Sequence, residues 1–211
     1  MKVGVLFSGG KDSTLTAFLM QSSGFDVELI TFIPKKRNSY MLHSENLNVS
    51  GLVAEAMGLK QHVFYVSGEK EVEVEEMLES IRTLNIQGLA SGANASEYQR
   101  QRIEYIGEEL ALPTYAPLWH KNYFQELSYL DIILVKYAAY GIDKYLLGKP
   151  FRVYSDLIHP YLEGGEGETL VVDAPFFKYK VVIDDYLIKD YKTWGELIVK
   201  KAHLEGKDEY I

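Results

Sequence analysis

The chain has 211 residues, 47% of them hydrophobic, and a formal net charge of −8 at pH 7. This length and composition suffice for one domain with a full core, or for a domain with a smaller appendage. The acidic balance argues against a protein that binds nucleic acid by neutralising many phosphates. The sequence contains no cysteine, which excludes disulfides, thiolate zinc sites and a cysteine nucleophile.

The N-terminus lacks the pattern of a signal peptide, and no apolar stretch is long enough to span a bilayer. Together with the absence of cysteine, this favours a soluble, cytoplasmic protein. We therefore expect neither a membrane nor a nucleic acid as partner. No linker, low-complexity tract or internal repeat divides the sequence.

The chain begins with an apolar run, Val3–Phe7, that predicts a buried strand. A glycine-rich turn, Ser8-Gly9-Gly10-Lys11-Asp12-Ser13, follows directly and opens a helix predicted to end near Gln21. Such a turn lets backbone N–H groups converge on an anion at the positive end of the helix. The turn therefore predicts a site for the phosphates of a nucleotide.

Side chains of this turn strengthen the prediction. Lys11 supplies a mobile cation, and Ser8 and Ser13 supply hydroxyl donors. Asp12 can cap the helix or, together with phosphates, hold a divalent metal. The common phosphate loop, with four residues between its first glycine and Gly-Lys-Ser/Thr, does not occur in the chain.

Strand-like and helix-like segments alternate through the first half. In chain order they are a strand at Val27–Ile33, a helix around Ser44–Met57, a strand at Gln61–Val66, a helix at Glu71–Leu84 and a strand at Leu89–Ser91. This alternation predicts an α/β fold, a Rossmann-like parallel sheet with helices on both faces. Ligands of such sheets collect at the carboxyl ends of the strands, where the glycine-rich turn lies.

A helix is predicted to start just after the fourth strand. Both Asn94 with Glu97 and Ser96 with Gln99 fit an N-terminal capping pattern, so the first turns of this helix face the ligand end of the sheet. Tyr98 and Arg102 lie one turn apart on one side of the helix, and Arg100 and Glu104 form an i,i+4 pair on another. Spacing alone is equally typical of a solvated helix face.

A third cluster is the acidic glycine-rich stretch Glu163-Gly164-Gly165-Glu166-Gly167-Glu168-Thr169. Three carboxylates on a glycine frame can hold a divalent metal or position an amine. Composition alone is also compatible with a polar surface turn.

The second half, from about Phe124, has a different texture. We expect a helix, the apolar run Ile132–Ala139, two strands near Thr169–Asp173 and Lys178–Asp184, and a closing helix from Trp194 to Leu204. These elements predict a smaller C-terminal α+β portion. We place the boundary between residues 1–123, which would bind the nucleotide, and residues 124–211, which would bind the acceptor substrate.

Ser8–Ser13 resembles the signature of the PP-loop ATPases, which cleave ATP between the α and β phosphates. The wider pattern resembles the diphthine–ammonia ligase family, whose members finish diphthamide on a histidine of translation elongation factor 2. The matching segments are Ser8–Ser13, Tyr40–His43, Ser91–Ala93, Glu97–Glu104, Pro117–Trp119, Lys136–Gly141, Leu147-Gly148 and Glu163–Phe177. The chain departs from the family at Leu162, usually glycine, at Gly167, usually aromatic, and at Tyr123, usually glutamine.

The resemblance implies an adenine nucleotide alpha hydrolase-like fold and an AMP-forming amidation that uses ATP, Mg²⁺ and ammonium. It implies that the protein substrate is elongation factor 2, with a homodimer possible. ATP would be bound by Ser8, Gly9, Gly10, Lys11, Asp12 and Ser13, with the metal on Asp12. Catalysis would involve Lys11, Asp12, Glu163, Glu166 and Glu168, and the acceptor would be bound by Tyr98, Gln99, Arg100, Arg102 and Glu104.

Two other functions stay open at this point. A PP-loop enzyme that adenylates a tRNA base would have the same loop, although the lack of cysteine argues against sulfur transfer and the acidic charge against RNA. A nucleotide-binding sensor without chemistry would leave Lys11, Asp12 and the three loop glutamates without a purpose.

Overall fold

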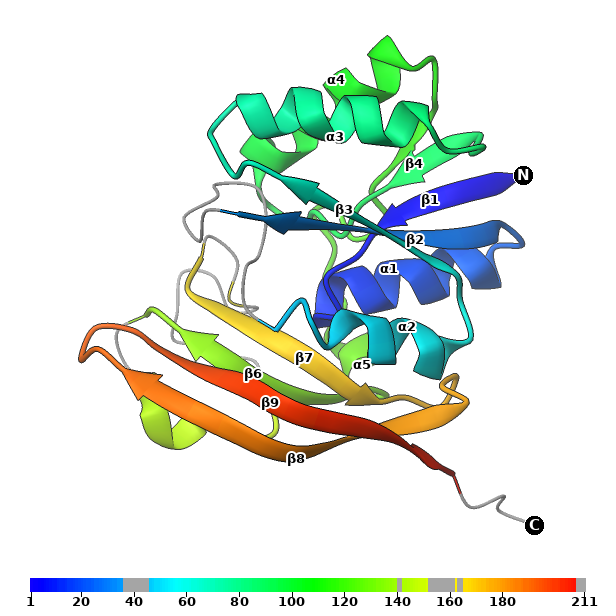
Figure 1. The fold of residues 1–211 in the computed structure, drawn as a ribbon. Helices are drawn as coiled ribbons and strands as arrows, with labels where there is room; N and C mark the ends of the chain where they lie inside the picture. The colour runs from blue at the N-terminus through cyan, green and yellow to red at the C-terminus, as the bar shows by residue number, and fades with distance from the viewer. Residues whose placement is uncertain (36–45, 140–141, 152–161, 163–164, 208–211) are drawn as a thin grey trace.

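The computed structural model describes residues 1–35, 46–139, 142–151, 162 and 165–207. The segment Tyr40–His43, one of the matching segments, lies outside these residues. Two sheets organise the described chain, one parallel and one antiparallel, and helices lie between them (Figure 1).

The parallel sheet has the strand order β3-β2-β1-β4-β5. Its strands are β1 (Lys2–Leu6), β2 (Asp26–Pro34), β3 (Gln61–Val66), β4 (Gly88–Ala90) and β5 (Thr114–Tyr115). Helices α1 (Lys11–Ser22) and α2 (Ser50–Met57) cover one face, and α3 (Val72–Arg82) and α4 (Glu97–Glu109) cover the other (Figure 1). This arrangement confirms the predicted α/β fold.

Burial explains why the first strands are continuous apolar runs. Val3, Val5 and Leu29 pack into the core shared with α1 and α2, whereas Ile30 and Leu89 pack into the core under α3 and α4. A parallel strand covered on both faces needs apolar side chains in both directions. The sheet thus fixes the position of the carboxyl end of β1, from which the glycine-rich turn emerges.

The second sheet is antiparallel, with the order β7-β6-β9-β8. Its strands are β6 (Asp131–Tyr137), β7 (Gly167–Asp173), β8 (Tyr179–Asp190) and β9 (Gly195–Gly206), preceded by the short α5 (Phe124–Leu127) and with the 3-10 turn η1 (Lys144–Leu146) after β6. One face packs against α1 and α2 (Figure 1). Phe18 of α1 stacks on Phe176, with ring centroids 4.1 Å apart. The expected smaller α+β portion is present.

The predicted closing helix at Trp194–Leu204 is wrong, because this segment is strand β9. Leu197 and Val199, two residues apart, are both buried on the sheet face that meets the helices. That two-residue period belongs to a strand, and the pairing with β8 satisfies the backbone of the segment. Tertiary pairing therefore overrides the local helical preference.

The helix expected around Ser44–Met57 is shorter than predicted, since α2 begins at Ser50. Asn46 has a left-handed backbone, with φ 55°, which a helix does not allow. Its buried amide donates to the Leu197 carbonyl and accepts from the Val199 N–H, at 2.7 and 2.8 Å. The turn before α2 is thus tied to β9 of the second sheet.

Candidate functional site

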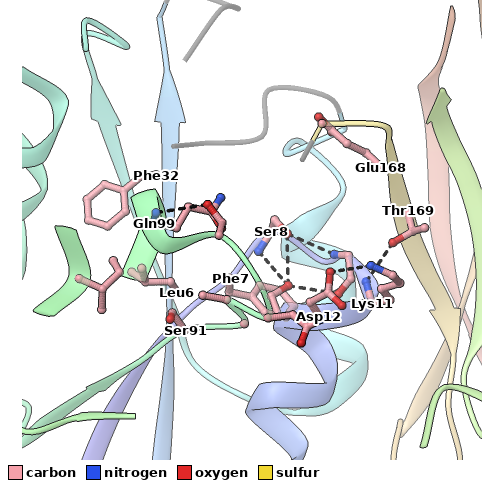
Figure 2. Close-up of a pocket in the computed structure, with 18 of the residues that line it drawn as sticks. Leu6, Phe7, Ser8, Lys11, Asp12, Phe32, Ser91, Gln99, Glu168 and Thr169 are labelled. Atoms are coloured by element: carbon pink, nitrogen blue, oxygen red, sulfur yellow. Dashed lines mark hydrogen bonds and ion pairs between the residues drawn. The ribbon is translucent and has the colours of Figure 1, made fainter. Parts of the chain in front are cut away.

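A cavity of about 710 Å³ opens at the carboxyl end of the parallel sheet. Figure 2 shows it between the first strands and α4 on one side and β7 on the other. Its polar end is lined by Ser8, Gly10, Lys11, Asp12, Ser13, Glu168 and Thr169. Its apolar end is lined by Leu6, Ile30, Phe32, Met77 and Ile103. The cavity therefore combines an anion-binding turn at one end with an apolar pocket at the other, of the kind that accepts a flat ring.

The glycine-rich turn has the geometry expected of a phosphate cradle. Gly9 has φ 81°, which a residue with a side chain rarely adopts, and Gly10 forms the N-cap of α1. The Ser13 hydroxyl donates to the Gly10 carbonyl at 3.1 Å and accepts from the Ser8 N–H at 3.2 Å. The turn is thus closed on itself at the positive end of α1.

Strand β7 of the second sheet supports the turn from outside. The Lys11 N–H donates to the Thr169 hydroxyl at 3.1 Å, and the Val171 N–H donates to the Gly9 carbonyl at 3.0 Å. A Cβ on Gly10 would stand 3.1 Å from the Thr169 carbonyl oxygen, so the approach of β7 needs glycine there. The glycine-rich turn and β7 therefore line one cavity.

Asp12 is held by two partners. Lys11 Nζ pairs with Asp12 Oδ2 at 2.7 Å, and the Tyr123 hydroxyl donates to Asp12 Oδ1 at 2.7 Å. Lys11 and Tyr123 are buried, with 4% and 2% exposure. Sequence reasoning missed Tyr123 as a site residue. One signal was its departure from the glutamine usual in the family, and another was its place a few residues after the matching segment Pro117–Trp119.

The turn after β4 packs closely against the glycine-rich turn. A Cβ on Gly92 would stand 2.9 to 3.0 Å from backbone atoms of Asp12 and Ser13. Ser96 then caps α4 by accepting from the Gln99 N–H, which confirms the second of the two predicted capping pairs. Tyr98 and Gln99 line the cavity.

Arg100, Arg102 and Glu104 are not among the residues that line the described cavity. Arg100 pairs with Glu97 and Glu104, at 2.7 Å each, and its hydrogen bond lowers the pKa of Glu97. This confirms the predicted i,i+4 pair. The structure therefore places Arg100 on the solvent side of α4, over the ring of Trp119.

Arg102 is held in a similar way. Its guanidinium lies 3.5 Å from the centroid of the Tyr98 ring, so these residues are indeed neighbours, and it donates to Glu71. The hydrogen bond from Arg102 lowers the pKa of Glu71. Binding of an acceptor carboxylate by Arg102 would therefore require Glu71 to give way.

The acidic stretch is only partly at the cavity. Glu168 lines it (Figure 2). Its Oε1 pairs with Lys136 Nζ at 3.2 Å. The side chain of Glu166 is not among the lining residues, while its carbonyl accepts from the Ala138 N–H. Glu163 lies outside the described residues. Of the two predicted carboxylates that the structure describes, Glu168 lines the cavity and Glu166 does not.

Two departures from the family compensate each other in space. A Cβ on Gly167 would stand 2.7 Å from Cδ1 of Leu162, whose side chain is 3% exposed, and 2.8 Å from the Lys136 carbonyl oxygen. Leu162 therefore occupies space that a side chain at position 167 would need. Leu162 also has φ 65°, the left-handed backbone that favours the glycine usual at this position.

A parallel α/β sheet whose first strand ends in a glycine-rich anion cradle defines a nucleotide-binding protein of the doubly wound type. The model of the diphthamide synthase N-terminal domain matches residues 1–114, and that of the diphthamide synthase C-terminal domain matches residues 116–204. The chain therefore belongs to the diphthamide synthase family.

Relatives named diphthine–ammonia ligase match nearly the whole chain. The protein from Schizosaccharomyces pombe is 31% identical over 99% of this chain and 40% of its own length. The protein from Danio rerio is 30% identical over 99% of this chain and 98% of its own length. The chain thus spans less than half of the first relative and nearly all of the second.

A solved structure described as a predicted subunit of a tRNA methyltransferase from Methanocaldococcus jannaschii has a TM-score of 0.46 and 23% identity. The match covers 64% of this chain and 77% of that chain.

In the ranges that the structure describes, no helix combines the length and apolar character needed to cross a bilayer.

Proposed function

We propose that this chain is a diphthine–ammonia ligase, which amidates diphthine on translation elongation factor 2 at the expense of ATP. The observation that carries the proposal is the shared cavity, in which the glycine-rich turn, an apolar hole and Glu168 meet. Family membership over both halves of the chain supports it against an RNA-modifying enzyme or a sensor.

The two ends of the cavity would bind different parts of ATP. The apolar end, around Phe32 and Met77, suits the adenine ring, and the N–H groups of the glycine-rich turn suit the β and γ phosphates. Ser8 and Ser13 add hydroxyl donors, and Lys11 adds the positive charge. A volume of about 710 Å³ leaves room for the acceptor side chain beside the nucleotide.

The reaction has two steps. An oxygen of the diphthine carboxylate bonds to the α-phosphorus while the bond to pyrophosphate breaks, which gives an acyl-adenylate. The nitrogen of ammonia then bonds to the acyl carbon while AMP leaves, which gives the amide. Lys11 and the loop N–H groups stabilise the charge that develops on the departing pyrophosphate.

Residues from both halves of the chain would bind ammonium and the diphthine carboxylate. Glu168 is the carboxylate placed to hold ammonium or to take its proton before attack. Glu163 and Glu166 stay assigned to the same role on the family pattern. Arg100 or Arg102 would bind the acceptor carboxylate after release from its present carboxylate partner.

Mg²⁺ fits the residues present, with Asp12 as its protein ligand. Among the described residues no three histidine, aspartate or glutamate side chains gather into a preformed metal site. Mg²⁺ is usually held by one or two carboxylates together with substrate phosphates, so one aspartate in the cradle suffices. When bound, the ion would neutralise phosphate charge.

The proposed substrate also implies an acceptor-binding region, partners and a cellular location for the protein. We assign residues 124–211 to acceptor binding, because β7 reaches the cavity from this portion. Elongation factor 2 and ammonium are the proposed partners, and the cytoplasm, where translation occurs, is the proposed location. A homodimer stays a prediction.

The nucleotide products test this function. Purified protein is mixed with ATP, Mg²⁺, ammonium and elongation factor 2 that carries diphthine, and each component is omitted in turn. We expect AMP and pyrophosphate only in the presence of the modified factor. ADP as the product, AMP formation that requires RNA instead, or ATP binding without AMP would each contradict the proposal.

A further inference from the structure

A row of alternating charges crosses the antiparallel sheet at one level. It takes one residue from each strand in spatial order, Glu168 of β7, Lys136 of β6, Glu196 of β9 and Lys189 of β8. Directly opposite residues of neighbouring strands share a face, so opposite charges stand side by side. Lys136 Nζ lies 3.2 Å from Glu168 Oε1, and Lys189 Nζ lies 3.8 Å from Glu196 Oε1. We call these four residues the charge row.

An irregularity in β6 brings Lys136 into the charge row. Leu134 pairs with Thr169, yet Lys136, two residues further, pairs with Glu168, which is only one residue from Thr169. Strand β6 therefore holds one extra residue, Val135, which is buried at 1% exposure. Bulges of this kind re-aim side chains and are frequent beside active sites. If the ladder continued in regular register from Leu134, Val135 rather than Lys136 would stand opposite Glu168.

Burial makes the charge row rigid. The side chains of Glu196, Glu168 and Lys136 are 2%, 12% and 22% exposed. A charge removed from water in this way is stable only with its partners in place, so each side chain has little freedom to turn away. In the register of the sheet Lys136 stands between Glu168 and Glu196, and its ammonium group pairs with Glu168.

The position of Glu168 gives the charge row a use beyond stability. Glu168 lines the cavity that contains the glycine-rich turn, and the next residue, Thr169, accepts from the Lys11 N–H. The backbone of Glu168 is thereby fixed relative to the ATP loop. Its carboxylate pairs with Lys136.

We infer that Lys136 is a positioning residue, which aims the Glu168 carboxylate at the site of ammonium attack. The inference rests on the proposed function, in which Glu168 handles ammonium. Loss of Lys136 leaves Glu168 in the cavity but lets its carboxylate rotate. A misplacement of about 1 Å in a reacting pair can cost on the order of 100-fold in rate.

The test compares two half-reactions in Lys136→Met, in the charge-retaining Lys136→Arg and in Lys201→Met, an exposed lysine of β9 as the matched control. Exchange of pyrophosphate into ATP, with diphthine-bearing elongation factor 2 and no ammonium, reports the first step. Amide formation against ammonium concentration reports the second. We expect Lys136→Met to keep exchange within about twofold and to raise KM for ammonium about 10- to 100-fold. Lys136→Arg should recover most of this loss, and Lys201→Met should match the wild type.

A double variant separates positioning from general stability. Because Lys136 acts through Glu168, Lys136→Met should add nothing to the defect of Glu168→Gln. Additive defects, or an equal fall of both half-reactions in Lys136→Met, would overturn the inference.

Crystal structures of the variants test the same point without an activity assay. We expect the Glu168 carboxylate to be displaced in Lys136→Met and in place in Lys136→Arg, and an unmoved Glu168 in Lys136→Met would also overturn the inference. A wild-type protein that forms no amide would instead refute the proposed function, and the position of Glu168 in the crystals would still decide the role of Lys136.

Discussion

The Tyr123 hydroxyl donates a hydrogen bond of 2.7 Å to Asp12 Oδ1 across 111 positions of sequence. The phenol ring is buried at 2% exposure, so its hydroxyl has a fixed direction. Together with Lys11 on the other oxygen, it sets the orientation of the carboxylate proposed to hold the metal. The glutamine usual at this position in the family can also donate a hydrogen bond.

Removal of this hydroxyl should impair catalysis more than folding. In Tyr123→Phe the ring still fills its site, but Asp12 loses a hydrogen bond to a charged group, worth about 1.5 to 3 kcal/mol. We expect kcat for AMP formation to fall about tenfold or more, and Tyr123→Gln to retain more activity than Tyr123→Phe. Steady-state kinetics provide the measurement. Tyr129→Phe, at an exposed position, is the control, and wild-type kcat in Tyr123→Phe would show that the hydroxyl does not orient Asp12.

A methyl group at Gly92 should separate the two turns that frame the phosphate site. The new Cβ would meet Asp12 and Ser13 backbone atoms at 2.9 to 3.0 Å, and backbone cannot rotate away as a side chain does. We expect Gly92→Ala to weaken ATP binding at least about tenfold and to cost about 1 to 3 kcal/mol of stability. Calorimetric titration with ATP and urea unfolding measure these effects.

Gly51→Ala is the matched control for this prediction, because its Cβ would make only an ordinary 3.5 Å contact with a side chain. Gly51 lies within α2, where alanine is the better helix former by up to about 1 kcal/mol. This variant should bind ATP normally and be no less stable than the wild type. Equal ATP affinity in the two variants would argue against a close approach at Gly92.

The exchange of volume between Leu162 and Gly167 predicts coupled effects. Gly167→Phe alone should destabilise the protein by about 1 to 3 kcal/mol, because Leu162 already fills the space. Leu162→Gly alone should leave a cavity that costs about 2 to 4 kcal/mol. In the double variant, which restores the family pattern, we expect part of the loss to be recovered, because the Lys136 carbonyl oxygen still lies 2.8 Å from a Cβ at position 167. Urea unfolding of all four proteins gives the coupling energy, and simple additivity would refute the compensation.

The stability of the first sheet should depend on pH through Glu28. The hydrogen bond from Lys2 and then that from His62, at 2.6 Å each, lower the pKa of Glu28 to about 2 from the ordinary value of 4.5. A folded-state pKa below the unfolded one contributes stability that is present above the ordinary pKa and lost as pH falls toward the folded value. Glu28→Gln should therefore be less stable than wild type by about 2 kcal/mol at neutral pH.

This difference should shrink between pH 4.5 and 2, where the wild-type carboxylate becomes protonated. Urea unfolding of both proteins across this range provides the measurement. Glu109→Gln, at the exposed end of α4, is the control variant. A wild-type advantage that stayed constant down to pH 2 would show that Glu28 is not held in its charged form.

Local patterns predicted the first half of the fold because its signals are local. The apolar run before Ser8, the glycine pair and the Ser96 cap each act within a few residues. The segment at 195–206 shows the limit, since its side chains suit either a helix or a strand and its pairing with β8 decides between them. No local pattern contains that partner.

The site was predictable to a similar degree. The glycine-rich turn and Glu168, which line the cavity, were singled out from motifs. Tyr123 and Lys136 were not assigned, because their contacts with Asp12 and Glu168 span long sequence separations. Arg100 and Arg102 attracted attention as charges near a ligand end. Their carboxylate partners, Glu97 and Glu71, become evident only in three dimensions.

The most direct test of the account follows the nitrogen atom itself. Protein, ATP, Mg²⁺ and isotope-labelled ammonium are incubated with diphthine-bearing elongation factor 2, and the modified histidine is analysed by mass spectrometry alongside AMP. We expect one labelled nitrogen in the new amide for each AMP formed, and neither product with Lys11→Ala, a variant that should remain folded in circular dichroism. AMP without labelled amide, or full labelling by Lys11→Ala, would contradict the account.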